Sequence, residues 1–221
     1  MSDTGVIYPT PSGRIGIFPR TGRGRLGGII SIIQDMEVRR AAYLSEMEKV
    51  EAESKSLIKE LSEEGCEQCV YTKGEVTLQN IIGWSEVSIA YQYYICHFPI
   101  YFQIMKVMEW TYGVAFDGFS PKECVLKETK ANYDQFFDEY GEMKFFMNLK
   151  YGKEGPFLKQ AKAQNAVALE GMPPGRLEWY FMQPISYAHA KKIFLMNGFK
   201  IDVFHKSMPS NFITEIFPEF K

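Results

Sequence analysis

Residues 116–130 read FDGFSPKECVLKETK and predict a β-hairpin. One strand is expected over 110–119 and a second over 124–130, with a turn at 118–122 that contains Pro121. Side chains alternate along a strand, so Glu128 and Lys130 should share one face with Cys124 and Leu126. A carboxylate and an ammonium group therefore lie side by side at the end of an otherwise apolar strand.

Asp117 closes the first strand of this predicted hairpin. If pairing brings Asp117 alongside Glu128, two carboxylates converge with the Lys130 ammonium at one edge of the sheet. Carboxylate oxygens are the ligands that Mg²⁺ or Mn²⁺ prefers, and a cation would lower the cost of crowding two negative charges. Such a metal suits phosphodiester hydrolysis, with the lysine stabilising charge that develops on the phosphate. A Glu and a Lys two residues apart on a strand also commonly form a plain surface pair.

The rest of the sequence predicts strands and helices in alternation around the hairpin. Ser85 is a candidate N-cap for a short helix that ends before Pro99. Further helices are expected over 132–151, 157–170 and 186–196, and further strands over 177–182 and 199–205. This order predicts an α/β (α+β) protein with a mixed sheet and helices on its faces.

The first 65 residues differ in composition from the rest. Residues 1–28 are rich in Gly and Pro and carry four Arg, which predicts an extended linker. Residues 29–65 place apolar side chains on one stripe of a long N-terminal helix, which could pack along the main domain or dock a partner. We therefore divide the chain into a linker (1–28), a helical region (29–65) and a main domain (66–221).

Composition and charge exclude several classes of protein. The chain has 221 residues, of which 46% are hydrophobic, so it can bury one sizeable core and is not a disordered chain. No apolar run approaches the roughly 18 residues that a membrane-spanning helix needs, so we expect no membrane partner. The net charge of -2 provides no general basic surface, so any nucleic-acid contact must be local. Lysines that could form a local basic patch are Lys127, Lys130, Lys144, Lys150, Lys153, Lys159 and Lys162.

The four cysteines are too few for a disulfide scaffold, and we expect a reducing working compartment. Cys66 and Cys69 have the spacing of half a zinc site, which Cys96 and His97 could in principle complete, but this is not a recognised finger. No Gly-x-Ser-x-Gly elbow or Walker loop is present in the sequence. A triad hydrolase and a nucleotide cofactor are therefore not indicated.

The region from about residue 66 to 205 resembles the PD-(D/E)xK nuclease superfamily and, within it, the restriction-endonuclease-fold toxins of class five. The segments that carry the resemblance are Glu109-Trp110, Phe116 to Phe119, Cys124 to Lys130, Tyr133-Asp134, Gln164 and Leu177 to Trp179. The resemblance implies a restriction-endonuclease-like core and a metal-dependent endonuclease in which Asp117 and Glu128 hold Mg²⁺ (or Mn²⁺) and Lys130 supports water activation. Thr129 stands where many relatives have alanine, and threonine suits a strand equally well. Cysteines near Cys66 and Cys69 are common in such toxins, which leaves metal binding, a disulfide and free thiols all open.

The same resemblance suggests further site residues. Glu86, just after Ser85, matches the position of another metal-binding carboxylate, although a carboxylate in the first turn is also favoured by the helix dipole. Gln160 and Gln164 are four residues apart on a predicted helix and could hydrogen-bond phosphate or the attacking water. They could equally belong to an exposed polar face.

Resemblance to these toxins also implies partners and a route. We expect a nucleic-acid substrate, with DNA favoured, and a cognate immunity protein. Delivery would use a bacterial secretion system such as type VI, with a delivery module or chaperone, into the cytoplasm of a rival cell. Two other functions stay open: a catalytically inactive interaction module that keeps the fold, and a metal-dependent phosphodiesterase of small nucleotides.

Overall fold

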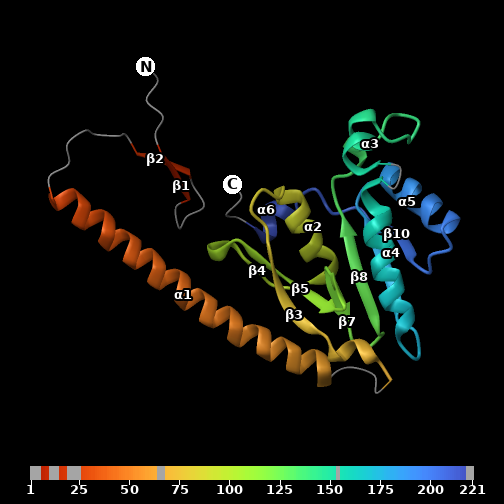
Figure 1. Ribbon diagram of the computed structural model, residues 1–221, viewed down its shortest axis with the longest axis horizontal. Helices are drawn as coiled ribbons and strands as arrows, with labels where there is room; N and C mark the ends of the chain where they lie inside the picture. Colours follow the sequence, from red (N-terminus) through yellow and green to blue (C-terminus); the bar gives the residue numbers. More distant parts are fainter. Residues whose placement is uncertain (1–5, 10–14, 19–25, 64–67, 153–154, 218–221) are drawn as a thin grey trace.

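The computed structural model of the protein describes residues 6–9, 15–18, 26–63, 68–152 and 155–217 (Figure 1). The main body is a mixed α/β structure, as predicted, but it has two sheets where the sequence analysis expected one mixed sheet. The long helix α1, Leu26–Glu63, lies along one side of this body. Within the segment expected to be a linker, β1 (Val6–Pro9) and β2 (Ile15–Phe18) form an antiparallel ribbon.

The first sheet of the body is antiparallel and has the order β3-β5-β4, with β6 paired to β5. Its strands are β3 (Glu75–Asn80), β4 (Ile100–Tyr101), β5 (Lys106–Tyr112) and β6 (Val114–Phe116). The second sheet has the order β10-β9-β8-β7. Its strands are β7 (Gly118–Ser120), β8 (Val125–Lys130), β9 (Arg176–Phe181) and β10 (Asp202–His205). The β7–β8 pair is antiparallel, whereas β8, β9 and β10 run parallel to one another.

Helices cover both faces of the second sheet (Figure 1). They are α2 (Glu86–Cys96), α3 (Phe145–Tyr151), α4 (Gly155–Glu170), α5 (Pro184–Met196) and α6 (Phe212–Ile216). On the α4 and α5 side, the ring of Phe157 contacts Trp179 and Phe181, and Phe194 contacts Trp179. All four side chains are fully buried, so this aromatic cluster fixes the position of α4 over β8 and β9.

Helix α2 lies on the opposite face of the sheet. The predicted cap is confirmed, since the Ser85 hydroxyl accepts a hydrogen bond from the backbone N–H of Ser88 at 3.2 Å. The last turn of α2 approaches β7 closely, because a Cβ at Gly118 would lie only 2.7 Å from the Cβ of Cys96. Glycine at position 118 is therefore required for this helix to sit against the sheet.

Two predicted elements were wrong. The single strand expected over 110–119 is broken at Gly113, whose φ of 71° reverses the chain between β5 and β6, and β7 starts only at Gly118. The helix expected over 132–151 is limited to its end, α3, preceded by a short 3-10 turn over Asp134–Phe136. Asp138 accounts for this, because its carboxylate accepts hydrogen bonds from the N–H groups of Tyr140 and Glu142 and holds a turn.

A disulfide joins Cys69 to Cys124, 55 residues apart, at the residue just before β8. Cys69 is therefore not available as a zinc ligand, and of the three states that the sequence left open for it the structure has the disulfide. Cys96 is a buried free cysteine. Cys66 lies outside the described residues.

Helix α1 packs on the body through its C-terminal half. Val50 and Leu61 are buried there, and the Tyr101 hydroxyl donates a 2.5 Å hydrogen bond to Glu53. Nearer the N-terminus of the helix, Met36 and Val38 are exposed. In the parts of the chain that the structure describes, no helix is both long and apolar enough to traverse a lipid bilayer.

Candidate active site

Asp117 and Glu128 meet because of the register between β7 and β8. Gly118 pairs with Lys127, so Asp117, one residue earlier, comes opposite Glu128, one residue later. The Asp117 carboxylate accepts hydrogen bonds from the backbone N–H of Thr129 at 2.7 Å and from its hydroxyl at 2.5 Å. Thr129 thus anchors Asp117 to the strand that carries Glu128.

Glu128 and Lys130 project from the same face of β8 toward α4. The Lys130 ammonium donates hydrogen bonds to Glu128 Oε1 and, at 3.0 Å, to Gln160 Oε1. Glu128 Oε2 accepts a 2.7 Å hydrogen bond from Gln164 Nε2. The structure therefore places Asp117, Glu128, Lys130, Gln160 and Gln164 close together.

Burial sets the electrostatics of this cluster. The side chains of Asp117, Glu128 and Lys130 are all buried, with 8%, 2% and 6% of their surfaces exposed. Burial and the nearby charge of Glu128 raise the pKa of Asp117 from 3.8 to about 7, against the opposing effects of Lys130 and of the hydrogen bonds from Thr129. When both are ionised, the carboxylates of Asp117 and Glu128 repel each other. A cation bound between them would relieve this repulsion.

Lys130 sits over an aromatic ring as well as beside carboxylates. Its ammonium is 4.9 Å from the ring centroid of Trp179, the residue that pairs with Glu128 in β9, and 5.9 Å from that of Tyr133. Burial by itself would lower the pKa of Lys130, but the negative charges of Glu128 and Asp117 and the hydrogen bond to Glu128 outweigh it and raise that pKa above its ordinary value. The carboxylates around Lys130 therefore favour its protonated, positively charged form.

Glu109 is a third carboxylate near the cluster, and its role was missed by the sequence analysis. It lies on β5 and has 9% of its surface exposed. Burial, followed by the charges of Asp117 and Glu128, raises the pKa of Glu109 to about 8. The signal that could have found it is a lone carboxylate within the otherwise apolar run Val107 to Trp110.

Glu86 is not brought to this cluster. It is exposed in the first turn of α2, while the opposite end of that helix, at Cys96, contacts β7. The ten residues between them correspond to about 15 Å of helix. Its position agrees with a favourable interaction with the helix dipole rather than with metal binding.

Asp117 and Glu128 would be the protein's ligands for a metal ion. Among the described residues, no three His, Cys, Asp or Glu side chains are arranged to hold a metal ion together. Two carboxylates suit Mg²⁺, which usually keeps several water molecules and binds proteins through one or two carboxylates. Gln164 Oε1 is buried without a hydrogen-bond partner, so it can accept a hydrogen bond from a water molecule next to Glu128.

The lysines expected to form a basic patch take different positions. Lys144, Lys159 and Lys162 are exposed, whereas Lys127 is half-buried and Lys130 belongs to the cluster. The side chains of Lys150 and Lys153 lie outside the described residues. Lys159 and Lys162 are on α4, which also carries Gln160 and Gln164, but they lie on its exposed side.

Residues 88–184 match the family model described as restriction endonuclease fold toxin 5. No curated protein matches the chain. The matched segment runs from α2 to the first residue of α5 and contains Glu109, Asp117, Glu128 and Lys130, whereas Glu86 falls outside it. Its two sheets and flanking helices are consistent with a restriction-endonuclease-like fold. Over this central segment the chain is therefore similar to the restriction endonuclease fold toxins, which indicates a nuclease toxin.

Proposed function

We propose that the protein is a metal-dependent endonuclease that hydrolyses phosphodiester bonds in nucleic acid, with DNA as the favoured substrate. One observation carries this proposal: Asp117, Glu128 and Lys130 are buried together, at facing positions of two strands, inside the segment that matches the toxin family. Carboxylates are rarely buried unless they are paired or hold a cation. Here Lys130 pairs with Glu128, whereas Asp117 is held by the backbone N–H and hydroxyl of Thr129.

Asp117 and Glu128 would hold Mg²⁺ or Mn²⁺ between β7 and β8. When bound, such an ion polarises the phosphate and lowers the pKa of a coordinated water. The hydrogen bonds from Thr129 orient Asp117, and Gln164 Nε2 orients Glu128, so the two carboxylates are held in place before substrate arrives. Preorganised ligands of this kind need no rearrangement during the reaction.

Lys130 would act as a positive charge and hydrogen-bond donor. The neighbouring carboxylates favour its protonated form, and its ammonium already donates a hydrogen bond to Glu128. A protonated lysine next to the scissile phosphate stabilises negative charge that develops on the non-bridging oxygens. The free acceptor Gln164 Oε1 is available to orient the attacking water.

We also propose that the protein is an antibacterial effector that acts in the cytoplasm of a target cell. The toxin description of the matching family supports this proposal. Delivery would require a bacterial secretion system, with a delivery module or chaperone joined to the N-terminal region. The producing cell would need an immunity protein that blocks the site around Glu128.

Plasmid digestion tests the proposed activity. Purified protein is incubated with supercoiled DNA, RNA and cyclic nucleotides, with Mg²⁺, with Mn²⁺ and with a chelator. We expect cleavage of DNA that requires the metal and is lost in Glu128→Gln, whereas the exposed Glu123→Gln of the same hairpin retains it. Absence of metal-dependent cleavage of every polymer would refute the nuclease, and cleavage of cyclic nucleotides alone would identify a small-nucleotide phosphodiesterase.

A further inference from the structure

Strand β10 leaves one edge of the second sheet open. Its residues Asp202–His205 pair with β9 on one side, and no other strand in the described ranges pairs with them. The N–H and C=O groups of an open edge are a template for a further strand. Natural proteins usually limit such pairing with short edge strands and charged side chains, and β10 is four residues long and carries Asp202, so a partner strand must match its few side chains.

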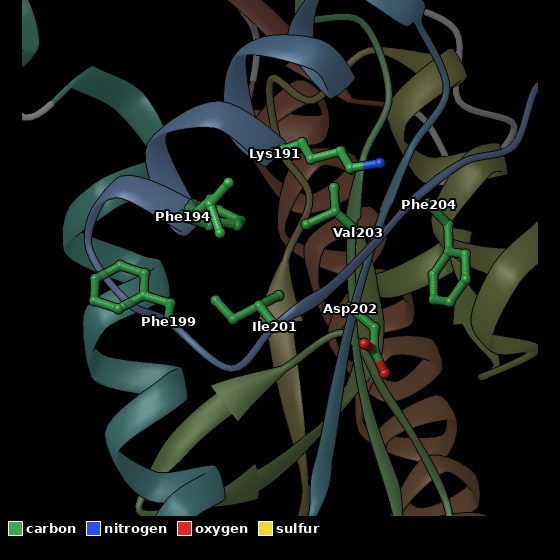
Figure 2. Close-up of a pocket in the computed structure, with 8 residues that line it drawn as sticks. Lys191, Phe194, Phe199, Ile201, Asp202, Val203 and Phe204 are labelled. Carbon is green, nitrogen blue, oxygen red and sulfur yellow. The ribbon is translucent and has the colours of Figure 1, made fainter.

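Apolar side chains gather beside this edge. A cavity of about 340 Å³ lies between α5 and β10 (Figure 2), where Lys191 and Phe194 reach it from α5 and Val203 from β10. Around it, Leu195 is 81% exposed and Phe204 is 39% exposed. Exposed apolar side chains next to free backbone groups favour association over a monomeric state.

We propose that the open edge of β10 pairs antiparallel with β10 of a second copy of this chain, about a two-fold axis at Phe204. A two-fold axis perpendicular to the sheet places residues of the same sheet face opposite one another. Asp202, Phe204 and Lys206 share one face: the Phe204 ring stacks on Tyr180 at 5.2 Å, and the Lys206 ammonium lies 4.9 Å from the Tyr94 ring. Because β10 alternates, Asp202 belongs to this face with them.

Charge complementarity selects this register. With the axis at Phe204, Asp202 of each copy comes opposite Lys206 of the other, and the two Phe204 side chains face each other. Moving the axis to Val203 would instead place Asp202 opposite Phe204 and lose both ion pairs. Opposite charges and aromatic pairs directly across strands stabilise a sheet, so the pattern of β10 is self-complementary about Phe204.

The backbone agrees with the same register. The N–H of Lys206 donates a hydrogen bond to the carbonyl of Phe181 in β9 at 2.9 Å. Because the direction of the backbone groups alternates along a strand, Asp202 and Phe204 also direct theirs toward β9. Val203 and His205 therefore direct theirs to the open edge. In the proposed register Val203 of one copy faces His205 of the other. The N–H of each residue can donate a hydrogen bond to the C=O of the other. The two-fold axis repeats this pair, so two such pairs join the strands.

Sedimentation equilibrium of the full chain over a range of concentrations tests this dimer. Asp202→Lys and Lys206→Asp should each raise the dissociation constant about tenfold, because two attractive pairs become repulsive. The double variant should return close to wild type, and the exposed Lys73→Asp, on a remote turn, should have no effect. The proposal is overturned if the wild-type chain stays monomeric, or if the dissociation constant of the double variant stays as high as that of the single variants. A monomeric chain would mean that the β10 edge does not pair with itself and is open to a strand of a different protein.

A crosslink checks the axis itself. Facing residues of a non-hydrogen-bonded pair have Cα atoms about 4.5 Å apart, which is within disulfide range. Phe204→Cys should therefore form a covalent dimer on mild oxidation. Val203→Cys should not, because the two copies of residue 203 would be separated by about 8 Å in this register. Equal crosslinking of both variants would show random collision and refute the register.

Discussion

Replacement of Asp117 by asparagine should change activity and stability in opposite directions. Asparagine keeps the shape of the side chain and an oxygen that can accept the hydrogen bonds from Thr129. It removes the charge that would hold the metal, so cleavage of plasmid should fall by about 10²-fold or more. A residue that serves only the fold would not combine this loss with a gain in stability.

The expected gain in stability follows from the raised pKa of Asp117. In the unfolded chain this carboxyl loses its proton near pH 3.8, whereas in the folded protein it keeps the proton until about pH 7. Between these values the folded protein binds more protons, so the free energy of unfolding falls as pH rises. A shift of about three pH units corresponds to about 4 kcal/mol. Above about pH 7 and without metal, Asp117→Asn should therefore be more stable than wild type by up to about 4 kcal/mol.

Urea unfolding at about pH 4 and about pH 8, with and without Mg²⁺, measures this effect. Wild type should lose stability toward the higher pH and regain it when Mg²⁺ is added, because a ligand that binds only the folded state stabilises it. Asp117→Asn should show a smaller pH effect and little response to Mg²⁺, while the exposed Asp35→Asn should behave as wild type. An Asp117→Asn protein that is less stable than wild type at the higher pH, or that cleaves at the wild-type rate, would refute the reasoning.

Three further substitutions probe the neighbours of this residue and the covalent link. Gln164→Leu removes the donor to Glu128 and should lower the free energy of unfolding by about 1–3 kcal/mol and cleavage by about tenfold; a wild-type rate in plasmid digestion would limit Gln164 to a structural role. Glu86→Gln should leave the Mg²⁺ affinity measured by calorimetry unchanged. A lower affinity in this variant would show that Glu86 contributes to the metal site. Combined Cys69→Ser and Cys124→Ser should lower the free energy of unfolding by about 4 kcal/mol, an amount that a reductant should reproduce in wild type but not in the double variant.

The centre of the site could be predicted because its geometry is local. Glu128 and Lys130 are two residues apart on one strand, so alternation alone places them on one face. Asp117 follows from the register of a short hairpin, in which few residues separate the paired strands. Gln160 and Gln164 follow from helical spacing. Each of these inferences needs only the nearest elements of secondary structure.

The remaining features depend on contacts that periodicity does not reveal. Glu109 approaches Asp117 only because β5 lies next to β7, although the two strands belong to different sheets. Gly113 turns the chain where the apolar pattern runs on without interruption. Cys69 and Cys124 pair across 55 residues, and spacing within the sequence gives no sign of which cysteines will meet.

The covalent link between Cys69 and Cys124 also bears on how the chain can travel. It closes a ring that holds β3, α2, β4, β5, β6 and β7, with β8 just outside it. Even a fully denatured oxidised chain would therefore enter a pore as a doubled thread at this ring. A conduit wide enough for only one extended polypeptide would stall there until the bond is reduced, whereas a machine that carries folded cargo would not be affected.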